Sequence, residues 1–115
     1  MKMKCFLHAK IHKAVVTEAN VNYVGSITID SHLLSLTGIL PGEKVLVTNN
    51  TNGNRLETYV IPGKKGEICM NGAASYLAKP KDEIIIMAFT WADKPVNPKI
   101  ILVDKNNNFL KNLTE

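Results

Sequence analysis

Pro41-Gly42-Glu43-Lys44-Val45-Leu46-Val47 (PGEKVLV) and Pro80-Lys81-Asp82-Glu83-Ile84-Ile85-Ile86 (PKDEIII) follow one pattern. Each segment comes after a short stretch of helical character, makes a proline-led acidic turn, and continues into an apolar strand. Two such half-units in a chain of 115 residues predict a pseudo-symmetric β-barrel. Many short strand-like runs separated by turn residues favour the same mainly β architecture.

Alternating apolar residues identify the strands that precede this repeat. Apolar and polar side chains alternate over residues 5–12, which predicts a strand with one buried face. Ser26–Asp30 (SITID) is again strand-like. Asp30 or Ser31 can then cap a short helix that ends at Gly38.

The segments between and after the repeats predict a hairpin and further short elements. Lys44–Thr48 and Arg55–Ile61 form paired strands joined at Asn52-Gly53, a pair typical of a type I′ turn with positive φ at both central residues. The other expected elements are a short strand at Glu67–Met70, a short helix at Ala73–Ala78, buried strands at Glu83–Phe89 and Lys99–Val103, and a turn with a frayed end from Asn106 onward.

Composition indicates one domain, residues 1–115, of an ordinary globular protein, with 45% hydrophobic and 21% charged residues. The net charge of +4 comes from dispersed lysines without a run of five like charges, so nucleic-acid binding is not expected. The longest strongly apolar stretch, Ile84–Phe89, is too short to span a membrane. We therefore expect a cytoplasmic protein, with Cys5 and Cys69 as buried free thiols.

Gly25-Ser26 allows two interpretations. On the dipeptide alone, a simple turn is favoured. The functional alternative is self-cleavage, in which the Ser26 hydroxyl attacks the Gly25 carbonyl in a strained turn whose backbone angles only glycine permits. β-Elimination of the resulting ester would leave a pyruvoyl group at position 26 and divide the chain into residues 1–25 and 26–115.

The strand Arg55–Ile61 carries a second candidate group. Because side chains alternate along a strand, Arg55 and Tyr59 share one face and Thr58 lies on the other. An exposed hairpin arginine is usually only solvated, but a guanidinium can bind a carboxylate through two parallel hydrogen bonds. Tyr59 is either a packing residue or a proton donor.

Asn71-Gly72-Ala73-Ala74 is the third candidate. The simpler reading is a strand-to-helix turn capped by Asn71. The functional reading is that small residues leave room for a substrate beside backbone N–H groups. Lys10 and His12 share a strand face and form a looser set with Tyr23, although a surface strand commonly carries such residues without a function.

Together these motifs resemble the bacterial aspartate 1-decarboxylase family. The matching segments, in family order, are Lys10–Lys13 (KIHK), Asn22–Asp30 (NYVGSITID), Thr51–Arg55 (TNGNR), Thr58-Tyr59 (TY) and Asn71–Ala74 (NGAA). The resemblance covers residues 3–90 and resumes at 98–104. Residues 90–97 look shorter than in many members, which affects C-terminal packing and assembly more than chemistry.

The resemblance implies a double-psi β-barrel with short helices, and a homotetramer with active sites between subunits. It implies an inactive precursor, cut between Gly25 and Ser26, whose pyruvoyl group decarboxylates L-aspartate to β-alanine and CO₂ for pantothenate and coenzyme A synthesis. By position, Ser26 becomes the pyruvoyl group, Tyr59 the proton donor, Arg55 the carboxylate ligand and Thr58 a helper in cleavage. The remaining site residues would be Asn71, Gly72, Ala73, Ala74 and Lys10, with His12 and Tyr23 close by.

Two rival functions remain open at this stage. One is a non-catalytic β-barrel that binds acidic partners or nucleic acid, and the other is a related barrel that keeps Ser26 intact and acts as a scaffold. The sequence also leaves open whether cleavage is spontaneous or needs a maturation factor, and which substrate carboxylate Arg55 holds.

Overall fold

Strands dominate residues 1–113, the part of the chain that the computed structural model describes. The elements are β1 (Lys4–Val15), β2 (Glu18–Asn20), β3 (Ser26–Asp30), α1 (Ser31–Thr37), β4 (Lys44–Asn49), β5 (Arg55–Gly63), β6 (Ile68–Asn71), the 3₁₀ helix η1 (Gly72–Tyr76), β7 (Glu83–Ala92), β8 (Lys99–Val103) and β9 (Phe109–Leu113). The mainly β class is therefore confirmed. The predicted helix caps are also confirmed, because Asp30 accepts a bond from the His32 N–H and Gly38 ends α1 with φ 79°.

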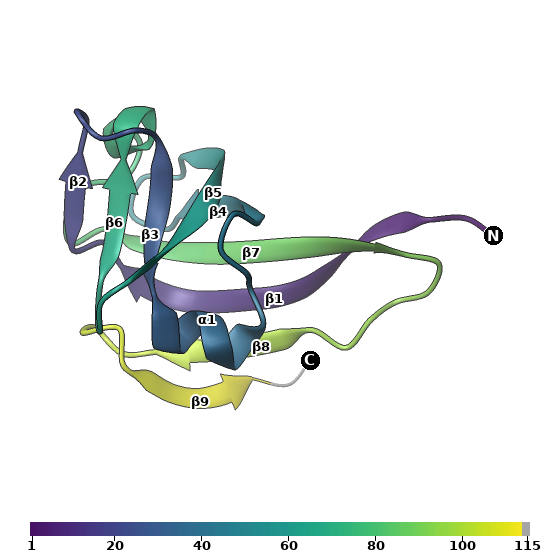
Figure 1. Cartoon of the computed structure of the whole chain (residues 1–115). Coiled ribbons are helices and arrows are strands. Elements are labelled where there is room, and N and C mark those ends of the chain that lie inside the picture. The colour runs from purple at the N-terminus through teal and green to yellow at the C-terminus, as the bar shows by residue number, and fades with distance from the viewer. Residues whose placement is uncertain (114–115) are drawn as a thin grey trace.

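The strands form one mixed sheet in the order β2-β6-β3-β5-β4-β7-β1-β8-β9. Parallel pairs join β2 to β6, β3 to β5, and β1 to β8, and the other neighbours are antiparallel. Figure 1 shows the long strands β1 and β7 side by side. Only residues 16 and 17 separate β1 from β2, which lies at the far end of this strand order, and the Thr17 N–H donates to the Ile68 carbonyl of β6 at 2.8 Å. The sheet therefore curls back on itself.

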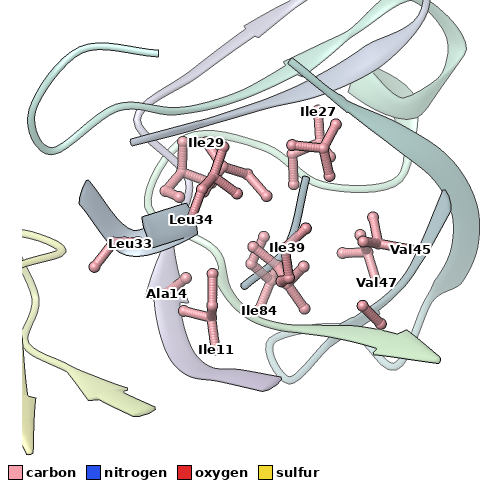
Figure 2. Packing of buried hydrophobic residues seen from close by; sticks show 14 of the residues in the cluster. Ile11, Ala14, Ile27, Ile29, Leu33, Leu34, Ile39, Val45, Val47 and Ile84 are labelled. Atoms are coloured by element: carbon pink, nitrogen blue, oxygen red, sulfur yellow. The ribbon is translucent and has the colours of Figure 1, made fainter. Parts of the chain in front are cut away.

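The inside of this curl holds the hydrophobic core. Buried residues alternate along β4 and the first part of β7, as the period of two predicts. Figure 2 shows the core isoleucines and valines of β3, β4 and β7 meeting Ile11 and Ala14 of β1 and the leucines of α1. Cys69 is buried as predicted, but the prediction for Cys5 is wrong because Cys5 is exposed. At that end β1 extends past β8 and pairs only with β7.

The two proline-led turns of the sequence repeat adopt the same conformation. Gly42 has φ 83° and Lys81 has φ 77°. The Gly42 N–H donates to the Val60 carbonyl at 2.7 Å, and the Val60 N–H donates to the backbone carbonyl of Glu43 at 3.1 Å. In the same way, the Lys81 N–H donates to the Val16 carbonyl at 2.8 Å, and the Val16 N–H donates to the backbone carbonyl of Asp82 at 3.0 Å. The strands that follow, β4 and β7, are antiparallel neighbours. The sequence repeat is therefore also a structural repeat.

The β4–β5 hairpin differs from its predicted geometry. Gly53 has φ 80°, whereas Asn52 keeps a negative φ, so a type I′ turn does not form. The Asn49 N–H instead donates to the Asn54 carbonyl at 2.8 Å, which leaves a longer loop. The side-chain amides of Asn49, Asn52 and Asn54 all donate to the Leu77 carbonyl, at 3.1, 3.3 and 3.2 Å. This distant anchor selects the wider loop.

The C-terminal segment also differs from the predicted frayed turn. The Asn-rich stretch is the connection to β9, which pairs with β8. The Asp104 carboxylate accepts bonds from the N–H groups of Asn106 (2.8 Å) and Asn108 (3.0 Å), and these bonds lower the pKa of Asp104. The buried Asn107 side chain bonds both backbone groups of Val15. Residues 114 and 115, where the frayed end was expected, lie outside the described residues.

Candidate functional site

Four side chains gather on one face of the β3–β6 pair. The antiparallel register sets Ser26 opposite Asn71 and Thr28 opposite Cys69. Because residues two apart on a strand share a face, these four side chains lie together, while Ile27 and Met70 between them point into the core. Ser26 is fully buried and Asn71 is 3% exposed.

Asn71 is the centre of a hydrogen-bond network. Its Nδ2 donates to Ser26 Oγ at 2.8 Å and to Thr28 Oγ1 at 2.9 Å, and its Oδ1 accepts from Cys69 Sγ at 3.1 Å. The prediction that the Asn71 side chain caps the following helix is therefore wrong. Asn71 occupies the N-cap position of η1, but its side chain makes no cap bond because the strand partners use all of its groups.

Gly72, not Gly25, has the backbone that needs a glycine. Its φ is 66°, and a Cβ there would lie 2.8 Å from Gly25 Cα and 3.0 Å from both Gly25 N and Tyr23 O. At Gly25 φ is outside the left-handed region, and a Cβ would meet only the Asn71 carbonyl, at 3.9 Å. The expectation that Gly25 adopts forbidden angles is wrong. The main chain of Gly72 packs closely against the residue before Ser26.

A pocket of about 250 Å³ opens beside Gly25. Its lining residues are Gly25, Leu56, Glu57, Thr58, Asn71, Ala73, Ala74 and Leu77. The helix expected at Ala73–Ala78 is instead the short 3₁₀ helix η1, which ends where the Leu77 N–H donates to the Ala74 carbonyl at 3.0 Å. The small side chains at 73 and 74 keep the space next to Gly25 open.

Strand β5 presents its side chains as its alternation predicts. Arg55 and Tyr59 are exposed on one face and Thr58 is half-buried on the other. The parallel β3–β5 register pairs Ile27 with Val60, so continuing it by one residue brings Tyr59 beside Ser26. Thr58 lines the pocket, whereas Arg55 and Tyr59 lie outside its lining.

Lys10, His12 and Tyr23 lie outside the lining of this pocket. Lys10 and His12 are half-buried on β1. The Tyr23 side chain is exposed, and the backbone carbonyl of Tyr23 lies close to Gly72. Within residues 1–113, His12 Nδ1 is a buried side-chain nitrogen without a hydrogen-bond partner. Burial lowers the pKa of His12, and the positive charges of Lys10 and Lys13 lower it further.

Sequence reasoning missed two members of the site, Thr28 and Cys69. A signal existed, because each residue lies two positions from a predicted one, on the same strand face. Recognising it required the pairing of β3 with β6, which local sequence does not reveal.

Residues 1–113 contain neither a membrane-spanning helix nor a cluster of metal-binding side chains. No helix there combines the length and apolar character needed to cross a bilayer. No group of three or more His, Cys, Asp or Glu side chains is arranged to hold a metal ion.

Comparison with known proteins identifies the family. A family model described as aspartate decarboxylase matches residues 1–110. An aspartate 1-decarboxylase of Desulfitobacterium hafniense is 54% identical over 114 residues, which cover 94% of this chain and 90% of the relative. Enzymes of the same name from Bacillus pumilus and Staphylococcus epidermidis are 51% and 45% identical, covering 90% and 98% of this chain and 87% and 93% of the relatives. The chain therefore belongs to the aspartate decarboxylase family.

Proposed function

We propose that this chain is the precursor of a pyruvoyl enzyme that decarboxylates L-aspartate to β-alanine and CO₂. Family membership supports the reaction. The observation that carries the pyruvoyl proposal is the buried Ser26 hydroxyl, which Asn71 holds. Ser26 directly follows Gly25, which lines an open pocket together with Asn71. A buried serine that follows a closely packed glycine fits the origin of such a group.

Maturation begins with Ser26 Oγ attacking the Gly25 carbonyl carbon. The new O–C bond replaces the C–N bond, and the hydroxyl proton ends on the Ser26 nitrogen. Elimination across Cα and Cβ of residue 26 then releases residues 1–25 with a free carboxylate. Hydrolysis of the dehydroalanine loses ammonia and leaves the ketone. Thr58 donates a hydrogen bond to the carbonyl oxygen during attack, a role supported by its position in the lining of the same pocket as Gly25.

In the mature site, the pyruvoyl ketone would supply an electrophile for the amine of aspartate and an acceptor for the electrons released with CO₂. Tyr59, next to Ser26 in the strand register, donates a proton to the former α-carbon. Arg55 holds a substrate carboxylate through its planar guanidinium. Asn71, Ala73 and Ala74 form part of the pocket wall, and Gly72 joins them along the chain.

The proposed assembly is a homotetramer of double-psi β-barrels in the cytoplasm. The two equivalent turns at Gly42 and Lys81 support the pseudo-symmetric barrel. Arg55 and Tyr59 are exposed in the single chain, and Tyr59 is 42% exposed. A site completed by a neighbouring subunit accounts for this exposure. In such an assembly, Lys10, His12 and Tyr23 of one subunit would lie close to the substrate bound at the site of its neighbour.

Denaturing mass spectrometry of the wild-type chain and of Ser26→Ala tests this function. We expect the wild type to separate into residues 1–25 and 26–115, with borohydride and aspartate trapping a covalent adduct only on the larger piece. Ser26→Ala should remain whole and form no β-alanine. Arg55→Ala should cleave normally but lose most turnover, and Arg55→Lys should recover little because an ammonium lacks the planar fork.

A whole wild-type chain without a reactive carbonyl would instead favour the scaffold or binding-module alternatives. Synthesis in a purified translation system decides whether a maturation factor is required, since only a chain that cuts itself will mature there.

A further inference from the structure

The orientation of the Asn71 amide needs an explanation. Its two ends are nearly identical in shape, and only Nδ2 can donate. The hydroxyls of Ser26 and Thr28 can each donate or accept, so neither of them determines which end faces β3. The third contact is Cys69 Sγ, 3.1 Å from Asn71 Oδ1.

We propose that Cys69 is a positioning residue for maturation, acting through Asn71. Its S–H donates to Oδ1 and thereby holds Nδ2 on Ser26 Oγ. Ser26 then accepts a hydrogen bond and keeps its own proton free to move to the leaving nitrogen during attack on Gly25. With the amide reversed, the Ser26 hydroxyl would donate its proton to Oδ1 and be held away from that path. This inference rests on the proposed function.

The surroundings of Cys69 suit a donor. The residue is 5% exposed, and burial raises the pKa of its thiol, with the negative charges of Glu18 and Glu67 raising it further. The thiol therefore keeps its proton at neutral pH. A thiolate would only accept hydrogen bonds, so it would attract Nδ2 and reverse the amide.

Cleavage rates of three variants test the role of Cys69. Cys69→Val removes the donor with little change in shape, and Cys69→Ser keeps a donor that can also accept. Thr37→Val is the matched control, because it removes a buried hydroxyl of α1 that donates to the Leu33 carbonyl outside the site. A neutral hydrogen bond of about 1 kcal/mol corresponds to roughly a fivefold change in rate. We expect Cys69→Val to cleave about threefold to tenfold more slowly and Thr37→Val to stay within about twofold of wild type. Cys69→Ser should lie between Cys69→Val and wild type, because its hydroxyl can donate to Oδ1 but can also accept from Nδ2.

A double variant and a spectrum separate positioning from general packing. If Cys69 acts through Asn71, adding Cys69→Val to Asn71→Ala should slow cleavage no further. In a Cys5→Ser chain, Cys69 is the remaining thiol. Its infrared S–H stretch should lie at the lower frequency of a bonded thiol and rise when Asn71 becomes alanine. The spectrum needs no cleavage, so it remains informative if Asn71→Ala does not mature.

Each result bears on a different conclusion. Wild-type cleavage by Cys69→Val, or a free-thiol stretch with Asn71 present, overturns the role of Cys69 and leaves the proposed function standing. A wild-type chain that never cleaves overturns both.

Discussion

The absence of a Cβ at Gly72 allows its backbone to pack against Gly25, next to the peptide bond that the proposed cleavage breaks. Gly72→Ala combines a positive φ with a contact of 2.8 Å to Gly25 Cα. We expect a destabilisation of about 1–3 kcal/mol from the strained backbone, increased by the clash, and severe slowing of cleavage. Urea unfolding in the uncleaved Ser26→Ala background and a mass-spectrometric time course measure the two effects.

Gly53→Ala is the matched control for Gly72→Ala. Gly53 has a similar φ of 80°, but no atom lies within 4 Å of its added Cβ. It should therefore lose some stability yet mature at the wild-type rate. Equal cleavage rates in the two variants would show that the close approach of Gly72 to Gly25 has no part in maturation.

His12 makes stability depend on pH through its depressed pKa. Its ordinary pKa is 6.5, and the folded protein holds it lower. As pH falls through about 6.5, His12 becomes protonated in the unfolded chain but stays neutral in the folded chain. The free energy of unfolding therefore decreases. The loss should continue until pH reaches the folded pKa and then stop.

Urea titrations one unit above and one unit below about pH 6.5 check this expectation. His12→Gln should show a smaller loss on acidification than the wild type, both in the Ser26→Ala background. His32→Gln is the control for the substitution itself, because it replaces an exposed histidine. An unchanged pH dependence in His12→Gln would contradict the role of burial at this histidine.

At the scale of the elements, the two equivalent turns carry different residues at their left-handed position. Gly42 tolerates its left-handed φ, whereas Lys81 carries a Cβ at φ 77°. A left-handed residue other than glycine costs about 1–2 kcal/mol, and glycine loses about 0.5–1 kcal/mol more chain entropy on folding. Lys81→Gly should therefore stabilise the chain by roughly 0.5–1 kcal/mol, and Gly42→Lys should destabilise it by a similar amount.

Lys65→Gly is the control for the turn variants, because Lys65 is also exposed but keeps a negative φ. It should lower stability in unfolding experiments on the Ser26→Ala chain. Equal losses at 65 and 81 would mean that the left-handed conformation at Lys81 carries no strain.

The elements also show why some structure was predictable and some was not. Strand alternation and the helix signals at Asp30 and Gly38 are local, so the sequence predicted them correctly. The β4–β5 loop and the connection to β9 are set by asparagine amides that bond distant carbonyls, such as those of Leu77 and Val15. These partners are far away in the sequence, so local turn preferences cannot predict them.

The same limit applies to the candidate site. The motif around Gly25-Ser26 and the face shared by Arg55 and Tyr59 could be read from order and alternation. The packing of Gly72 on Gly25 and the contact of Cys69 with Asn71 depend on which strands pair, so they emerged only in three dimensions.

For the whole molecule, the proposed cut leaves an interior strand on the shorter piece. β1 belongs to residues 1–25 and lies between β7 and β8, which belong to residues 26–115. Its side chains at Ala9, Ile11 and Ala14 are fully buried in the core. Neither the strand hydrogen bonds nor this apolar burial requires the peptide bond at Gly25-Ser26.

The two pieces should therefore stay together after cleavage. We expect them to co-elute in size-exclusion chromatography without denaturant and to separate in concentrated urea. Uncleaved Ser26→Ala, run alongside, should elute at the same native volume because the fold does not depend on the cut. A short piece that left the folded protein in native buffer would contradict this, since removing β1 would expose the edges of β7 and β8 and open the core to water.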